Sequence, residues 1–122
     1  MRYSGPERRQ NQRIHGRFIV SYRILEDASV VDITQTKNIS LGGMLLTTNR
    51  EFSRGTKLGI EIRLPFDPNP IMLLAVVQDS KEIAAGLIYD TRLQFLSIDQ
   101  KHIDSISQTV AHYLKKEKNE KN

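Results

Sequence analysis

Apolar and polar side chains alternate along most of the chain, which is the period of a half-buried β-strand. The alternation is clearest over residues 18–24 and 57–64, where every second side chain is apolar. Glycine and proline interrupt it at Gly42-Gly43 and in the stretch 65–70, and proline cannot donate to a strand ladder. The sequence therefore predicts six short strands, over residues 18–24, 29–38, 44–48, 57–64, 71–78 and 86–96.

Only the end of the chain has the period of a helix. Its apolar side chains lie on one face of a 3.6-residue repeat, and they are Ile103, Ile106, Val110, Tyr113 and Leu114. Lysines follow at the C-terminal end of this stretch, where the helix dipole favours cations. Six strands and one closing helix predict a mainly β fold, a six-stranded antiparallel β-barrel with one C-terminal α-helix and a flexible N-terminal arm.

The chain of 122 residues has material for a single domain with one core. Residues 1–16 hold few apolar side chains and include Gly5-Pro6, so we expect an arginine-rich arm without a core of its own. The barrel and its helix are expected over residues 17–114, and a polar tail over residues 115–122.

Composition excludes several classes of protein. There is no cysteine, hence no disulfide and no thiolate metal site. The N-terminus lacks the apolar segment of a secretory signal, and the longest apolar stretch, residues 71–77, is too short to span a bilayer. We therefore expect a soluble, cytoplasmic protein without membrane insertion.

The sequence also lacks the usual marks of an enzyme or a metal site. It has neither a Gly-x-Ser-x-Gly nucleophile motif nor a phosphate-binding GxxxxGK[ST] loop. His15, His102 and His112 are not spaced four residues apart and have no carboxylate cluster beside them, so they are expected to be ordinary surface histidines. We expect no enzymatic activity, no metal and no bound cofactor.

Positive charge is concentrated near the N-terminus. Residues 1–17 contain five arginines, no lysine and one glutamate, which accounts for the whole formal charge of +4. Lysine would serve equally well for loose attraction to a polyanion, whereas the planar arginine fork holds phosphates and guanine edges in a bidentate way. The arm is therefore a candidate binding element.

Two short motifs carry the candidate chemistry. Arg9 and Arg13 form an RxxxR spacing just before the first predicted strand, and Asn38, Ser40 and Gly43 form an NxSxxG spacing at a turn between two strands. Because residues i and i+2 of an extended segment share a face, Asn38 and Ser40 are expected to present polar groups side by side. Gly43 leaves room for a ligand or for a crossing backbone. A guanine ligand with two phosphates would find donors on the arginines, and an acceptor and a hydroxyl on the turn.

With this ordered pair of motifs the sequence resembles the PilZ domain family, the bacterial receptor module for cyclic di-GMP. The resemblance covers residues 8 to about 114 and includes the closing strand and helix that begin at LQFLSIDQ. It implies a six-stranded β-barrel and assigns cyclic di-GMP binding to Arg9, Arg13, Asn38, Ser40 and Gly43.

Two departures from the family pattern have different consequences. The family commonly has aspartate where this chain has Asn38, and an amide offers one acceptor oxygen, so weaker binding is expected. Arg92 stands where the closing strand often has glycine, which concerns local geometry. Arg8, next to the RxxxR element, is a further candidate that would reach a second, stacked ligand molecule.

The resulting hypothesis is a cyclic di-GMP receptor whose arm orders on ligand binding and signals to a partner protein. The alternative is a PilZ-like adaptor without ligand, acting through protein contacts in motility or pilus function. A non-specific nucleic-acid binder is a third class. Its binding would fall steeply with salt and ignore base identity, and we expect no nucleic-acid partner.

Overall fold

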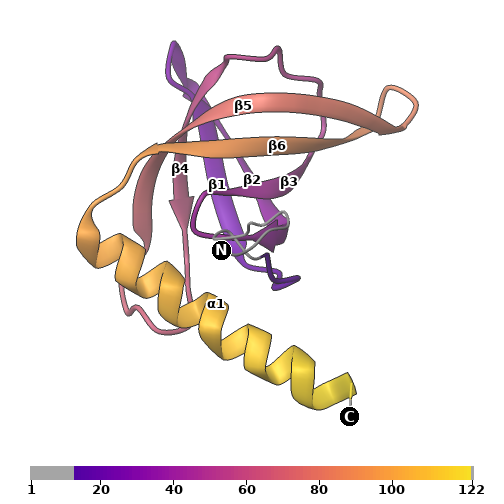
Figure 1. Ribbon diagram of the computed structural model, residues 1–122. Helices are drawn as coiled ribbons and strands as arrows, with labels where there is room; N and C mark the ends of the chain where they lie inside the picture. The colour runs from indigo at the N-terminus through magenta and orange to yellow at the C-terminus, as the bar shows by residue number, and fades with distance from the viewer. Residues whose placement is uncertain (1–12, 122) are drawn as a thin grey trace, which may run out of the picture.

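The computed structural model describes residues 13–121, so Arg8, Arg9 and most of the expected arm lie outside the described residues. It contains six strands and one helix (Figure 1). These are β1 (Ile19–Ile24), β2 (Asp27–Ile39), β3 (Gly43–Thr48), β4 (Lys57–Ile62), β5 (Ile71–Ala84), β6 (Ile88–Ser97) and α1 (Gln100–Lys121).

The strands close into an antiparallel barrel with the order β1-β2-β3-β6-β5-β4. Since β3 and β4 are three places apart in a ring of six, they lie on opposite sides of the barrel. The predicted mainly β fold, a six-stranded antiparallel barrel with a C-terminal helix, is confirmed.

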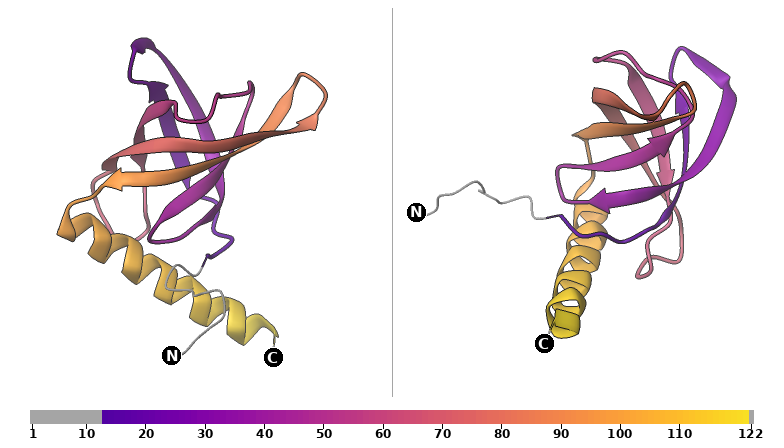
Figure 2. Two further views of the ribbon diagram at one scale, coloured as in Figure 1. Left: turned by 45° about the horizontal axis from the view of Figure 1, so that its top comes forward. Right: turned by 90° about the vertical axis from the view of Figure 1, so that its right-hand side faces the viewer.

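The core fills the barrel and continues onto the helix. Alternate strand residues point inward, as the period-two pattern predicts. The helix lies across one end of the barrel (Figures 1 and 2) and contributes Ile106 and Val110, which are buried. The ring of Tyr113 meets that of Phe18 edge to face, with 5.4 Å between centroids. Most of the predicted helical stripe is therefore core.

The elements at both ends of the chain extend further than the sequence pattern predicts. Ile14 is fully buried and forms a two-bond bridge with Ile39, so the core begins before residue 17. The helix continues through residues 115–121, where a polar tail is expected from composition. No helix in the described part of the chain is long and apolar enough to cross a lipid bilayer.

The β5–β6 hairpin is also longer than predicted. β5 continues past residue 78 to Ala84, and its end, which is paired with the start of β6, projects beyond the barrel (Figure 1). The turn at its tip is closed by the amide of Leu87, which donates to the carbonyl of Ala84 over 2.9 Å. Gly86 adopts a φ of 67°, a left-handed conformation that other residues avoid.

Candidate functional site

The segment that carries Arg13 is tied down at three points. The bridge between Ile14 and Ile39 joins it to β2. The buried hydroxyl of Thr36 donates to the carbonyl of Gly16 over 2.6 Å and accepts from the amide of Phe18 over 3.0 Å. On the other side, the amide of His15 donates to the Glu117 carboxylate of α1 over 3.1 Å. Arg13 therefore leaves the barrel from a fixed position.

From that position Arg13 reaches the first residue of the second motif. Its Nη1 atom donates to Oδ1 of Asn38 over 2.6 Å. The structure thus brings together one arginine of the RxxxR element and the asparagine of the NxSxxG element, although 25 residues separate them along the chain. Arg8 and Arg9 lie outside the described residues.

A second guanidinium group lies on the same outer face. Asn38 on β2 is opposite Leu45 on β3, and Leu45 is opposite Arg92 on β6, so the three form one row across the sheet. Desolvation by the surrounding protein and then the positive charge of Arg92 lower the pKa of Arg13 from its usual value. The ion pair of Arg92 with Asp79 is long, at 3.8 Å, and half-exposed. Two neighbouring guanidinium groups, one of them in this long, half-exposed ion pair, form a surface suited to an anion.

The strand period predicts that Ser40 presents its hydroxyl beside Asn38, but the structure places it elsewhere. The residue is fully buried. Its hydroxyl accepts from the amide of Gly42 over 3.2 Å and lies 3.4 Å from the carbonyl oxygen of Gly43. The chain turns at Ser40, so the two-residue repeat of the strand ends there. Within the turn the serine holds the backbone of residues 40–43 in place.

Glycine is required at position 43 because the backbone of β6 passes close to it. Its φ is not in the left-handed region, but a Cβ placed on it would clash with the carbonyl oxygen of Leu93 in β6. The amide of Phe95 also donates to the carbonyl of Gly42 over 2.9 Å. The NxSxxG element therefore brings β3 and β6 close together, and this positions Arg92 beside the motif.

From the sequence alone, Arg92 is only a departure from the closing-strand pattern of the family. The alternation of β6 places Asp90, Arg92 and Gln94 on its outer face, and this is the signal that identifies them. Asp90 accepts from Lys37 over 3.0 and 3.1 Å, and Gln94 accepts from Gln78 over 2.6 Å. These two pairs lie to either side of Arg92 along the strand.

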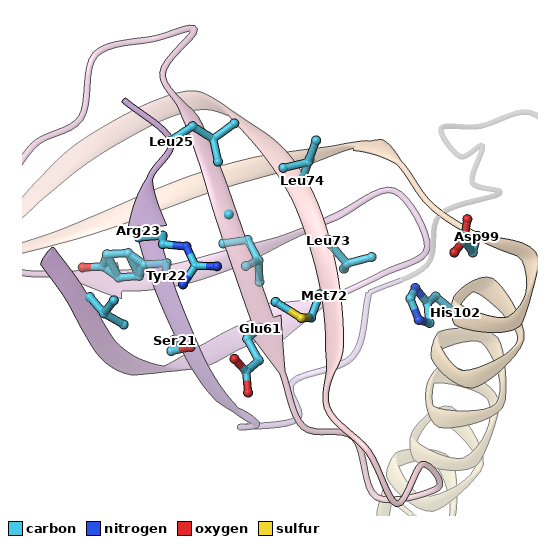
Figure 3. A pocket seen from close by; sticks show the side chains of 13 residues that line it. Ser21, Tyr22, Arg23, Leu25, Glu61, Met72, Leu73, Leu74, Asp99 and His102 are labelled. Carbon is cyan, nitrogen blue, oxygen red and sulfur yellow. The ribbon is translucent and has the colours of Figure 1, made fainter. Parts of the chain in front are cut away.

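A groove of about 290 Å³ lies elsewhere, on the outer face of β1, β4 and β5 next to the start of α1 (Figure 3). None of the motif residues that the structure describes lines it. Within residues 13–121, no three histidine, aspartate or glutamate side chains gather as a metal site would require. The candidate ligand surface is therefore the outer face around Arg13, Asn38 and Arg92, and the groove is a separate feature.

Comparisons with known proteins agree with this architecture. The family model of the PilZ domain matches residues 7–112. No curated protein sequence matches the chain. Among solved structures, the inhibitor of motility MotI/DgrA of Bacillus subtilis is similar with a TM-score of 0.74 and 22% identity, over 95% of this chain and 54% of that one.

Two similar structures contain cyclic di-GMP. The PilZ domain of YcgR from Escherichia coli has a TM-score of 0.67 and 14% identity, over 93% of this chain and 97% of that one. The MrkH complex of K. pneumonia has a TM-score of 0.71 and 16% identity, over 93% and 56%. The chain thus spans about half the length of MotI and MrkH. Because the family model covers most of its residues, the chain belongs to the PilZ domain family.

Proposed function

We propose that this protein is a cytoplasmic receptor for cyclic di-GMP. The observation that carries the proposal is the guanidinium of Arg13 resting on the amide oxygen of Asn38, with Arg92 beside it on the outer face of the barrel. Membership of the PilZ family and similarity to two domains that bind this nucleotide support the same conclusion.

The chemistry of the surface fits a doubly phosphorylated guanine ligand. Arginine forks donate to phosphate oxygens and to the O6 and N7 atoms of guanine, and they stack on its face. The amide oxygen of Asn38 accepts from guanine N–H groups. In the free protein Arg13 and Asn38 satisfy one another, so the ligand replaces one internal hydrogen bond with several of its own. The turn from Ser40 to Gly43 keeps Asn38 in position.

The proposal extends to the N-terminal segment. Arg9 completes the RxxxR element on the first ligand molecule, and Arg8 contacts a second, stacked one. On binding, residues 1–12 close over the ligand, and an effector protein recognises the changed surface. Protection of these amides from hydrogen exchange when cyclic di-GMP is added is the expected sign. Unchanged exchange would remove this part of the proposal.

Isothermal titration calorimetry with cyclic di-GMP, cyclic di-AMP and GMP tests the central claim. Only cyclic di-GMP is expected to bind tightly, and a stoichiometry of two per chain is expected from the stacked pair. Each charged arginine contact is worth roughly 1.5–3 kcal/mol, so Arg13→Ala or Arg9→Ala should weaken binding about 10- to 100-fold.

The matched control is Arg63→Ala, which removes an exposed arginine directly after β4, on the opposite side of the barrel. Its affinity should equal that of the unmodified protein. A flat titration of the unmodified protein would contradict the proposal and favour an adaptor that acts through protein contacts alone. Equal losses of affinity in Arg13→Ala and Arg63→Ala would show that binding depends only on the net charge of the protein.

A further inference from the structure

The outer face of β1, β4 and β5 is unusually apolar for the solvent side of a barrel. Four large apolar side chains, exposed by 42–57%, line the groove, and they are Leu25, Val31, Met72 and Leu74. Figure 3 labels three of them, Leu25, Met72 and Leu74. Ile33, which is 76% exposed, is paired with Ser21 at its edge. Outward strand positions are normally polar, and a contiguous apolar patch of this kind marks an interaction surface.

Strand register places the residues of this face in two adjacent rows. In one row across the barrel, Ile33, Ser21, Glu61 and Met72 are successive partners on β2, β1, β4 and β5. In the adjacent row, Arg23, Gly59 and Leu74 are successive partners on β1, β4 and β5. Apolar side chains therefore flank a centre that contains one cation, one anion and a glycine.

Gly59 lines the groove between Arg23 and Leu74, its partners on β1 and β5. Its φ is not positive, and an added Cβ would only touch side chains, the nearest atoms being Leu25 Cδ2 at 3.4 Å and Arg23 Nε at 3.6 Å. Neither backbone conformation nor space within the chain requires glycine here. A glycine inside a strand often marks a place where another molecule comes close, and here it opens the groove to one.

The two charges at the centre have opposite signs. Arg23 on β1 and Glu61 on β4 are both half-buried at the groove (Figure 3). Neither side chain forms an ion pair or a hydrogen bond with another described residue. Asp99 and His102 also line the groove, at its end next to α1, so the one unpaired cation and the one unpaired anion are those of the strands. Such a pair is complementary to itself, because a two-fold axis brings each charge of one copy opposite the other charge of the second.

We propose that this face is a dimer interface between two copies of the chain. Around the two-fold axis, Arg23 meets Glu61 of the partner subunit, and Glu61 meets Arg23 of the partner subunit. Met72 and Leu74 then cover the partner's groove above Gly59. Such an isologous contact buries the exposed apolar side chains of both copies at once.

Sedimentation velocity over a range of protein concentrations tests the proposal, with circular dichroism to check folding. The unmodified protein is expected to dimerise. Arg23→Glu and Glu61→Arg each place like charges in contact and should weaken dimerisation about 100-fold. The double variant Arg23→Glu/Glu61→Arg restores opposite charges and should dimerise again.

Two further variants distinguish the contribution of the groove to dimerisation from the contributions of charge and of general surface hydrophobicity. Gly59→Leu fills the groove without altering a charge and should also dissociate the dimer. Leu87→Glu, at the tip of the β5–β6 hairpin, removes an apolar side chain that is 68% exposed and should leave the dimer intact. The proposal is overturned if the unmodified protein sediments as a monomer throughout, if the double reversal stays monomeric, or if only Leu87→Glu dissociates the dimer.

Discussion

At the scale of single residues, two strand glycines show that one residue type serves two physical purposes. A side chain on Gly43 would collide with the backbone of β6, whereas a side chain on Gly59 would project into the open groove. Neither position has a positive φ, so conformational freedom explains neither glycine. The two glycines differ in the distance from an added Cβ to the backbone of the neighbouring strand.

Gly43→Ala is therefore expected to destabilise the fold by about 2–3 kcal/mol. Its Cβ would strike the Leu93 carbonyl oxygen and lie 3.1 Å from the Leu93 carbonyl carbon and 3.2 Å from Cα of Gln94. These are backbone atoms that move only with the strand. Urea unfolding measures the loss, and Gly59→Ala is the matched control, expected to be neutral or slightly stabilising. Equal stability of the two variants would contradict the close approach of β3 and β6.

Ser40 shows where residue-level reasoning needs the fold. Its place two residues after Asn38 predicts a shared face, but the chain leaves the strand there and the hydroxyl bonds within the turn. The motif was recognisable from the sequence. Which of its side chains faces outward depends on where the strand ends.

At the scale of elements, the candidate site is a row across β2, β3 and β6. Asn38, Leu45 and Arg92 are partners in the ladder, and the bridge at Ile14 adds Arg13 to this row. No single element contains the site. Arg92 belongs to it because β6 pairs with β3, a contact between segments far apart in the chain.

Arg92→Ala is expected to weaken cyclic di-GMP binding about 10-fold, which corresponds to about 1.4 kcal/mol for one exposed charged contact. Arg92→Lys should recover only part of the loss, because an ammonium lacks the bidentate fork. Calorimetry against the same Arg63→Ala control measures this. If Arg92→Ala binds normally while Arg13→Ala does not, Arg92 is not part of the site and the receptor function stands.

At the scale of the whole molecule, the two proposed surfaces lie on opposite sides of the barrel. The ligand surface is centred on β3 and the dimer face on β4, three places apart in the closed sheet. Each surface can therefore be occupied without contact with the other. One small barrel therefore has room for both proposed sites.

We expect Met72→Glu, which disrupts the dimer face, to bind cyclic di-GMP with unchanged affinity. Calorimetry on the monomeric variant checks this, and sedimentation of the unmodified protein with and without ligand gives the reciprocal measurement, because coupling between two equilibria acts equally in both directions. A shift in either measurement would show that the barrel transmits ligand binding to the opposite face.

The sequence by itself determined the number of strands, the closing helix and the two motifs, and the family followed from the resemblance that the motifs carry. These depend on side-chain period and on turn residues, which are local properties of the chain. Tertiary structure alone decided the inclusion of Ile14 in the core, the length of the β5–β6 hairpin, the position of Arg92 beside Arg13, and the groove over Gly59. Each of these depends on which distant segments pair and how closely their backbones approach, and neither quantity is encoded in the pattern of any one segment.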